Sequence, residues 1–251
     1  MADKLWVLGS AGWMPATGRE TSCFLVELAG ELVMLDAGTG VANLSLVPEV
    51  LERHDRLSIV LSHYHLDHVI GLMYLRRFTA NKRVDVYGPG QPVYPRTTAA
   101  YVADLLQDAL YSAGHLGFAR EVHFIDYAGR DFRVGNVTVF VRRQEHSAAS
   151  FELRLTDAVT YATDTTFRPS AWEDPVPTQV LLHECWQQGN ADSRHTSIEA
   201  LVAGLPLDRF QHTLLIHQNP EWDAATRNEV IRIATEAGMR LASDGMYIDL
   251  A

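Results

Sequence analysis

The sequence contains little cysteine and lacks any long apolar run. Cys23 and Cys185 are its only cysteines, they lie far apart, and neither has neighbours at metal-ligand spacing. This argues against a disulfide framework and favours two buried thiols. No window approaches the roughly 18 consecutive apolar residues of a transmembrane helix, and the stretch "MADKLWVLGS" does not look like a signal peptide. We therefore expect a cytoplasmic protein with no membrane partner.

Positive charge is also scarce. Lys and Arg number 21 against 31 Asp and Glu, which gives a formal net charge of -10 at pH 7. Proteins that hold long nucleic acids neutralise phosphates with clustered cations, so this balance makes a large nucleic acid the weaker choice of partner.

Strand-like and helix-like patterns alternate along the chain. The first third reads as strands at residues 4–9, 23–28 and 31–38, with Gly30 in a hairpin turn between the last two. Helical periodicity then interleaves with strands, and a long amphipathic stretch spans residues 97–114. No Pro, Gly or Ser-rich linker and no internal repeat divides the sequence. We predict a mixed α/β fold of layered sheets with outer helices, with residues 1–251 forming one domain.

The stretch "SHYHLDH", residues 62–68, places three histidines and an aspartate directly after an apolar, strand-like run. His63 and His65 are two residues apart, so the end of a strand can present both on one side. Asp67 and His68 stand where a helix is expected to begin. Imidazole and carboxylate are ligands that zinc and related transition metals favour. The cluster therefore predicts one half of a metal centre.

The other half must come from elsewhere in the chain. His146, Asp164 and His217 each follow an apolar strand, a position where active-site groups of layered α/β proteins often lie. Each is a weak signal alone, since an Asp before Thr165 could equally cap a turn. Other histidines show no partner pattern, and we expect them on the surface or in the core: His54, His115, His123 and His212.

In chain order, "SHYHLDH", the His of "QEHSAAS", the Asp of "YATDTT" and the His of "LLIHQNP" resemble the metallo-β-lactamase-fold hydrolases. The resemblance spans almost the whole chain and implies a four-layer αββα sandwich with two metal ions at the sheet edges. The ligands that it implies for one ion are His63, His65 and His146, and those for the other are Asp67, His68 and His217. It assigns Asp164 as the bridge between the ions and Asp36 as a support behind the site.

The physical chemistry of the residues agrees with this assignment. Two cations a few ångströms apart need a shared anion to offset their repulsion, and a bridging carboxylate and hydroxide supply it. Water bound there ionises near neutral pH and becomes a nucleophile. We expect two divalent ions, Zn²⁺ in the first place and Mn²⁺ as the alternative.

Within the superfamily, the chain looks most similar to the tRNase Z and phosphodiesterase branch. "LLHECW" resembles its H-E-A-T stretch, and "RHTSIEAL" resembles its H-S-T stretch. Thr196 and Glu199 read as a capping box that would hold His195 just before a helix, where it could protonate a leaving alkoxide. Glu184 would orient His195 or a metal ligand, or would only supply a polar strand end. We predict Asp67, His195 and Glu184 as the catalytic residues, with an exposed His195 beside the cap as the alternative.

The chain departs from tRNase Z enzymes between His146 and Asp164, where the interval is too short for their long tRNA-gripping arm. We therefore expect a phosphodiesterase for small or cyclic phosphodiesters, such as nucleotides, with a tRNase Z-like endoribonuclease as an alternative. A lactone, thioester or β-lactam hydrolase of the same fold and a non-catalytic metal-binding or nucleotide-sensing module are further alternatives. Residues 94–118 could line a pocket, form a lid, contact a second copy in a homodimer, or pack as a core helix.

Overall fold

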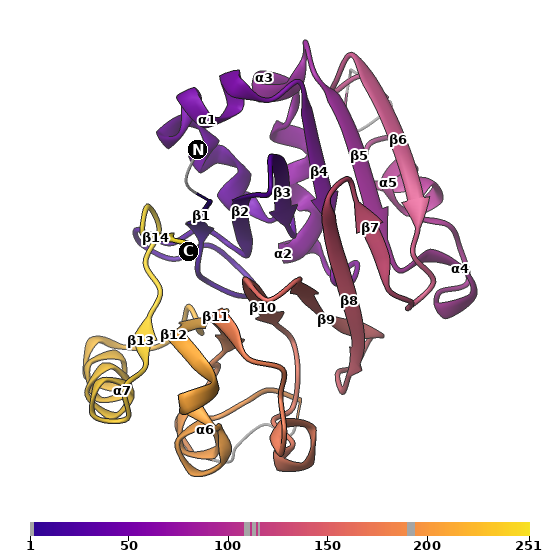
Figure 1. Ribbon diagram of the computed structural model, residues 1–251. Helices are drawn as coiled ribbons and strands as arrows, with labels where there is room; N and C mark the ends of the chain where they lie inside the picture. The colour runs from indigo at the N-terminus through magenta and orange to yellow at the C-terminus, as the bar shows by residue number, and fades with distance from the viewer. Residues whose placement is uncertain (1–2, 108–110, 112–113, 115, 190–193) are drawn as a thin grey trace.

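The computed structural model describes residues 3–107, 111, 114, 116–189 and 194–251, which form two sheets of seven strands (Figure 1). The first sheet has the order β14 (Tyr247–Asp249), β1 (Lys4–Gly9), β2 (Cys23–Leu28), β3 (Glu31–Leu35), β4 (Arg56–Val60), β5 (Arg83–Gly88) and β6 (Glu121–Asp126). The second has the order β13 (Arg240–Leu241), β12 (Phe210–Ile216), β11 (Thr178–Glu184), β10 (Val159–Ala162), β9 (Ser150–Leu155), β8 (Val137–Gln144) and β7 (Phe132–Val134).

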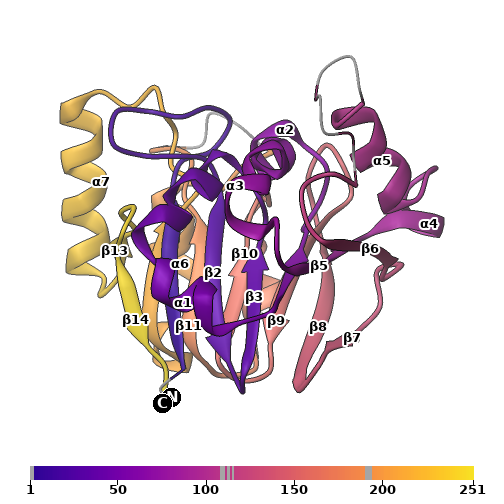
Figure 2. The ribbon, with the colours of Figure 1, turned by 90° about the horizontal axis from the view of Figure 1, so that it is seen from above.

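The two sheets face each other, and helices cover their outer faces (Figures 1 and 2). Apolar side chains from both sheets, such as Phe24 of β2 and Tyr161 of β10, form one buried cluster between them. The helical segments against the first sheet are η1 (Thr39–Leu46), α1 (Pro48–Arg53), α2 (Leu66–Val69), η2 (Ile70–Tyr74), α3 (Arg76–Thr79), α4 (Gly90–Val93) and α5 (Thr98–Leu105). Those against the second are η3 (Pro169–Trp172), α6 (Ile198–Gly204), η4 (Leu207–Arg209) and α7 (Ala224–Glu236). The predicted four-layer αββα sandwich is confirmed.

Most predicted elements are present, and two strands were missed. Gly30, at φ 81°, lies in the β2–β3 hairpin turn, as the sequence predicts. The strands β7 and β13 contain three and two residues, too few for an alternating pattern to be visible in the sequence. Within the described part of the amphipathic stretch 97–114, the helix spans Thr98–Leu105, and Tyr111 lies outside it.

The capping box predicted before α6 is wrong by one residue. Ser197, not Thr196, is the N-cap, and its Oγ accepts a hydrogen bond from the backbone N–H of Ala200 at 3.2 Å. The carboxylate of Glu199 accepts instead from the N–H of Gly189. On the helix that follows, Ile198 and Leu201 are buried, whereas Val202 is 45% exposed.

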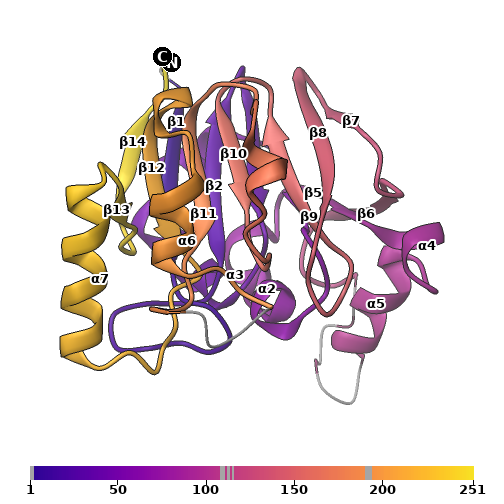
Figure 3. The same cartoon turned by 90° about the horizontal axis from the view of Figure 1, so that it is seen from below.

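The carboxyl ends of several strands meet at one edge of the sandwich, which lies toward the bottom in Figure 3, the view from below. In the first sheet β3, β4 and β5 are parallel, and in the second β10, β11 and β12 are parallel. Polar residues that follow these strands are therefore carried to a common edge, where layered α/β proteins place their sites. None of the helices within the described residues has the length and apolar character needed to cross a membrane.

Candidate metal centre

The "SHYHLDH" segment turns from the end of β4 into α2. His65 is the N-cap of this short helix, and Asp67 and His68 lie in its first turn. The side chain of His63 is fully buried, while that of His65 is 42% exposed. This turn thus directs both buried and accessible imidazoles toward the sheet edge, as the spacing predicts.

Three histidines surround one oxygen of Asp164. Asp164 Oδ2 lies 3.3 Å from His63 Nε2, 3.2 Å from His146 Nε2 and 3.7 Å from His65 Nδ1. His146 Nε2 and His65 Nδ1 are 3.3 Å apart. These four residues form a group able to hold one cation.

The other oxygen of Asp164 faces a second group. Asp164 Oδ1 lies 2.8 Å from His217 Nε2 and 3.3 Å from His68 Nε2. Asp67 Oδ2 is 3.2 Å from His217 Nε2 and 3.3 Å from His68 Nε2. The structure therefore brings together the seven predicted ligands, with the Asp164 carboxylate between two groups of three.

The spacing of these atoms fits metal ligation. Ligand atoms at the corners of a tetrahedron with metal bonds of about 2.0–2.1 Å lie about 3.3 Å from one another. Most of the separations above fall near this value, and they exceed the usual length of a hydrogen bond. Two buried ring nitrogens, the Nε2 atoms of His63 and His68, have no hydrogen-bond partner among the described residues. Buried polar atoms are rarely left so, and here a cation would satisfy both.

The opposite nitrogen of each of these two rings is held by the protein. His63 Nδ1 lies 3.0 Å from Ser62 Oγ, and His68 Nδ1 lies 2.6 Å from Asp36 Oδ2. Asp36 also accepts hydrogen bonds from the backbone N–H and the hydroxyl of Ser62, both at 2.7 Å. Partners of this kind fix the tautomer and direction of metal-binding imidazoles. Asp36 thus lies behind the site, where the resemblance placed it.

The site concentrates buried negative charge. Asp36, Asp67, Asp164 and Glu184 have side chains that are 0%, 11%, 3% and 0% exposed. Burial alone would raise the pKa of Asp164, but the charges of His217 and His68 outweigh it and hold that pKa well below its usual range. Burial would likewise raise the pKa of Asp67, but the charge of His68 and the hydrogen bonds to His217 and His68 lower it. Four buried carboxylates at one edge need cations to compensate them, and divalent metal ions supply two charges each.

His63 and His146 of the first group present neutral imidazoles. Burial lowers the pKa of His63, and burial also lowers the pKa of His146 to about 4. A neutral ring carries the lone pair that a metal ion needs. His146 is oriented by its Nδ1, which lies 3.4 Å from the backbone carbonyl of Arg194.

Three residues at the site adopt left-handed backbone conformations that non-glycine residues rarely occupy. The φ angles of Asp36, Asp164 and His217 are 54°, 46° and 49°. Such conformations cost about 1–3 kcal/mol each and persist only where the surroundings hold them. Because three such residues lie together, we infer that the required placement of their side chains, rather than the local backbone preference, sets these conformations.

His195 and Glu184 lie beside the two groups. Glu184 Oε2 accepts a hydrogen bond from His195 Nδ1 at 2.8 Å, which leaves His195 Nε2 for the cleft. Glu184 Oε1 accepts from the N–H groups of Thr165 and Thr196 at 2.7 and 3.3 Å. Glu184, His195 and His217 also lie close enough to count as a metal-binding group, but the short Glu184–His195 hydrogen bond accounts for that contact.

A cleft of about 530 Å³ opens over these residues. Beside His65, Asp67, His146, Asp164, His195 and His217, its walls include Trp13, Leu66, Ser147, Trp186 and Arg194. Trp186 stacks on His195 with ring centroids 4.8 Å apart, and Trp13 is 58% exposed. Sequence reasoning missed both tryptophans. The one available signal was Trp186 itself, which follows the "HEC" that resembles a family motif.

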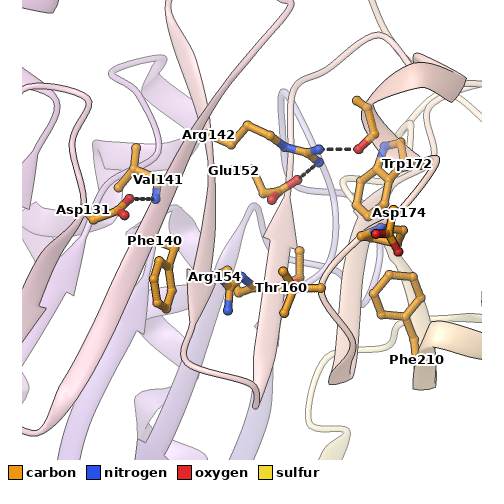
Figure 4. A pocket seen from close by; sticks show the side chains of 13 residues that line it. Asp131, Phe140, Val141, Arg142, Glu152, Arg154, Thr160, Trp172, Asp174 and Phe210 are labelled. Carbon is orange, nitrogen blue, oxygen red and sulfur yellow. Dashed lines mark hydrogen bonds and ion pairs between the residues drawn. The ribbon is translucent and has the colours of Figure 1, made fainter.

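A second hollow, of about 310 Å³, lies on the outer side of β8, β9 and β10 (Figure 4). Arg142 bonds to the carboxylate of Glu152 and to the carbonyl of Ala171, and its guanidinium lies 4.9 Å from the centre of the Trp172 ring. Asp131 accepts a hydrogen bond from the N–H of Val141 at 2.8 Å. These charged groups are already paired within the protein, and the hollow shares no lining residue with the cleft.

Outside the two ligand groups, four described histidines are absent from the cleft lining: His54, His123, His183 and His212, the last of which is half-buried on β12. His54 bonds Glu27 at 2.8 Å, His123 contacts Asp85 and Glu121, and His183 packs against Phe167 and Trp172. His115 lies outside the described residues. Cys23 and Cys185 are both buried, as predicted.

The helix α5 lies beside the cleft. Val102 belongs to the core and also lines, with Tyr101, Leu105, Tyr64 and Leu66, an apolar groove of about 300 Å³. Leu66 also belongs to the cleft wall. Of the alternatives left open for residues 94–118, the structure therefore supports both a core helix and a pocket wall.

The tyrosine at position 161 joins the two sheets behind the metal centre. Its hydroxyl, on β10, donates a 2.6 Å hydrogen bond to Asp36 Oδ2, the atom that also holds His68. We predict that Tyr161→Phe weakens metal binding by about tenfold, because groups that hydrogen-bond to the partners of metal ligands have effects of this size. Competition titration with a zinc chelator measures it. Tyr127→Phe is the control, since it removes another buried hydroxyl bond, to the carbonyl of Leu61, and should leave metal affinity unchanged.

The fold and this arrangement of ligands define a protein of the metallo-β-lactamase fold. Solved structures support the fold: YhfI from Bacillus subtilis superposes with a TM-score of 0.76 at 19% identity, covering 98% of both chains. A diphosphatase of the PhnP family has a TM-score of 0.76 at 18% identity, covering 99% of this chain and 98% of its own. A family model described as "Anti-Pycsar protein Apyc1" matches residues 4–238, and the chain belongs to this family.

Curated relatives agree with the fold. The probable metallo-hydrolase YhfI of Bacillus subtilis is 24% identical over 204 residues, which cover 78% of this chain and 80% of that protein. The ribonuclease Z of Methanopyrus kandleri is 28% identical over 151 residues, which cover 59% of this chain and 48% of that enzyme. The match to this chain thus spans about half the length of that relative.

Proposed function

We propose that the protein is a dinuclear metal-dependent hydrolase that acts on small or cyclic phosphodiesters. The observation that carries this proposal is the Asp164 carboxylate, whose Oδ2 faces three histidines and whose Oδ1 faces His68 and His217. A carboxylate in that place can offset the repulsion between two cations. The donor set of imidazoles and carboxylates favours Zn²⁺, with Mn²⁺ as the alternative.

Bound ions would supply an activated water near neutral pH and would polarise the oxygens of a phosphoryl or acyl group. The chain itself contributes position and proton transfer. Asp67 Oδ2 lies between His68 and His217 and is fixed by the backbone N–H of Trp13 at 2.7 Å. It is therefore placed to hold a reacting oxygen close to the second group.

His195 is the proposed proton donor to the leaving group. Burial lowers the pKa of His195, but the hydrogen bond and charge of Glu184 more than compensate and raise it above its usual value. The ring is held on one side by Glu184 and against Trp186, and it lines the cleft. A donor of this kind matters most for alkoxide leaving groups, which favours a phosphodiester over an activated ester or lactone.

The short segment between His146 and Asp164 supports a small substrate. It contains only β9 and β10, joined by a turn at residues 156–158, with no inserted arm. A ribonuclease Z-like activity remains the second candidate, because several relatives carry that name. An assay with a tRNA precursor beside cyclic nucleotides separates the two, and cleavage of the precursor alone would favour the second.

The proposed chemistry predicts that chelation and loss of one ligand both remove activity. We expect hydrolysis of bis-p-nitrophenyl phosphate to disappear with chelator and to return with added zinc or manganese. His65→Ala should lower kcat/KM by about 10³-fold or more, because metal polarisation is worth several kcal/mol. The matched control is His123→Ala, whose ring contacts Asp85 and Glu121 far from the cleft lining. Turnover that survives both treatments would contradict the metal mechanism.

A further inference from the structure

The segment that follows β1 runs directly beside the second ligand group. Gln218, the neighbour of His217, donates its backbone N–H to the carbonyl of Ser10 at 3.0 Å. Its carbonyl accepts the N–H of Gly12 at 3.1 Å. We call residues 10–14 the N-terminal strap. It is tied to the residue after His217 by this pair of hydrogen bonds.

Within the strap, Gly12 lies flat against the His217 ring. A Cβ added to Gly12 would lie 2.4 Å from Cε1 of His217 and 2.5 Å from its Nδ1 and Nε2. Real side chains never approach so closely, so any larger residue must displace the imidazole. Only glycine lets the backbone serve as the wall that fixes this ring.

The next residue, Trp13, holds Asp67, which belongs to the same ligand group as His217. The backbone N–H of Trp13 donates a 2.7 Å hydrogen bond to Asp67 Oδ2, the oxygen that lies 3.2 Å from His217 Nε2. Trp13 adopts φ 59°, a conformation that a bulky residue rarely takes. The backbone bends in this way to aim the N–H at the carboxylate.

The strap has a firm anchor of its own. Asp244 accepts hydrogen bonds from the N–H and the hydroxyl of Ser10 at 3.0 and 2.7 Å, and from the N–H of Glu20 at 2.7 Å. Ser10 and Glu20, on either side of the loop that contains the strap, are therefore both tied to one half-buried carboxylate near the C-terminus. Because the strap is anchored in this way, its contacts can fix the positions of His217 and Asp67.

We propose that Gly12 is a positioning residue for the second ion, and that the strap sets the geometry of His217 and Asp67 while the first group is independent of it. The inference rests on the metal centre of the proposed function but not on its substrate. The proposal treats the two ligand groups differently. Among the described residues, no hydrogen bond links His63, His65 or His146 to the strap.

Gly12→Ala tests the proposal. We expect the wild type to bind two zinc ions and the variant to bind the first normally, with the affinity for the second reduced about 10- to 100-fold. Elemental analysis and competition titration measure this. High zinc or manganese should restore part of the lost kcat, and wild-type affinity for the first ion in the same variant would exclude a general loss of stability. The control is Gly18→Ala in the same loop, where φ is 70° and an added Cβ meets nothing within 4 Å, so this variant strains the backbone without touching His217.

Hydrogen exchange of the wild type provides a test that does not depend on the folding of a variant. Filling of the second site should slow exchange of the amides of Gly12 and Trp13, whereas filling of the first should not. Unchanged exchange, or two ions bound by Gly12→Ala with wild-type affinity, would overturn the proposal. A wild type that binds no metal would instead defeat the metal centre itself, so the two failures are distinguishable.

Discussion

Replacing Asp164 by Asn is expected to reduce kcat/KM by about three orders of magnitude or more and to lower the metal content below two ions per chain. Both oxygens of this carboxylate face ligand groups, at 2.8 to 3.7 Å from five imidazoles. The amide keeps the shape but loses the charge that offsets two cations, and losing several kcal/mol of electrostatic stabilisation costs about tenfold per 1.4 kcal/mol.

The substitution is a clean test because the backbone tolerates it. Asp164 has φ 46°, a left-handed conformation that Asn accepts as readily as Asp. Asp157→Asn, in the exposed turn between β9 and β10, is the matched control and should retain both ions and full activity. Wild-type metal content in Asp164→Asn would show that Asp164 is not a bridge.

His195→Ala is expected to have an effect that depends on the leaving group. With an alkyl phosphodiester, whose alkoxide needs a proton, we expect kcat to fall by about 10²-fold or more. With bis-p-nitrophenyl phosphate, whose leaving group departs as a stable anion, the loss should be less than about tenfold. Rates for a series of leaving groups measure this directly, because the slope against leaving-group pKa becomes steeper when the donor is removed.

Metal content is the companion measurement for His195. The variant should still bind two ions, because His195 is held by Glu184 and lies outside the two groups around Asp164. An equal loss for both kinds of substrate would argue against proton donation. Loss of an ion would instead assign His195 as a ligand together with Glu184 and His217.

The sequence could predict the parts of this protein that local pattern determines. Alternation located the long strands, and the rule that polar residues follow strand ends located His146, Asp164 and His217. The resemblance to a known fold then paired them with the "SHYHLDH" cluster. These residues are found because their chemistry is visible in the side chain.

Other parts depend on contacts that no local pattern records. Gly12 meets His217 from more than two hundred residues away, and Trp13 acts through a backbone N–H that any residue possesses. Thr196 and Ser197 are both good N-caps. Tertiary contacts decide between them, because the Thr196 hydroxyl donates to the carbonyl of Thr165 and its N–H to Glu184. Which of the two residues caps the helix can therefore be read only from the folded structure.

The most direct test of the account is an anomalous difference map from crystals of the zinc-loaded protein, recorded at the zinc edge. The account predicts two peaks, one on each side of the Asp164 carboxylate: one within bonding distance of His63, His65 and His146, the other of Asp67, His68 and His217. A single peak, or a peak between Glu184 and His195 in place of either, would contradict it.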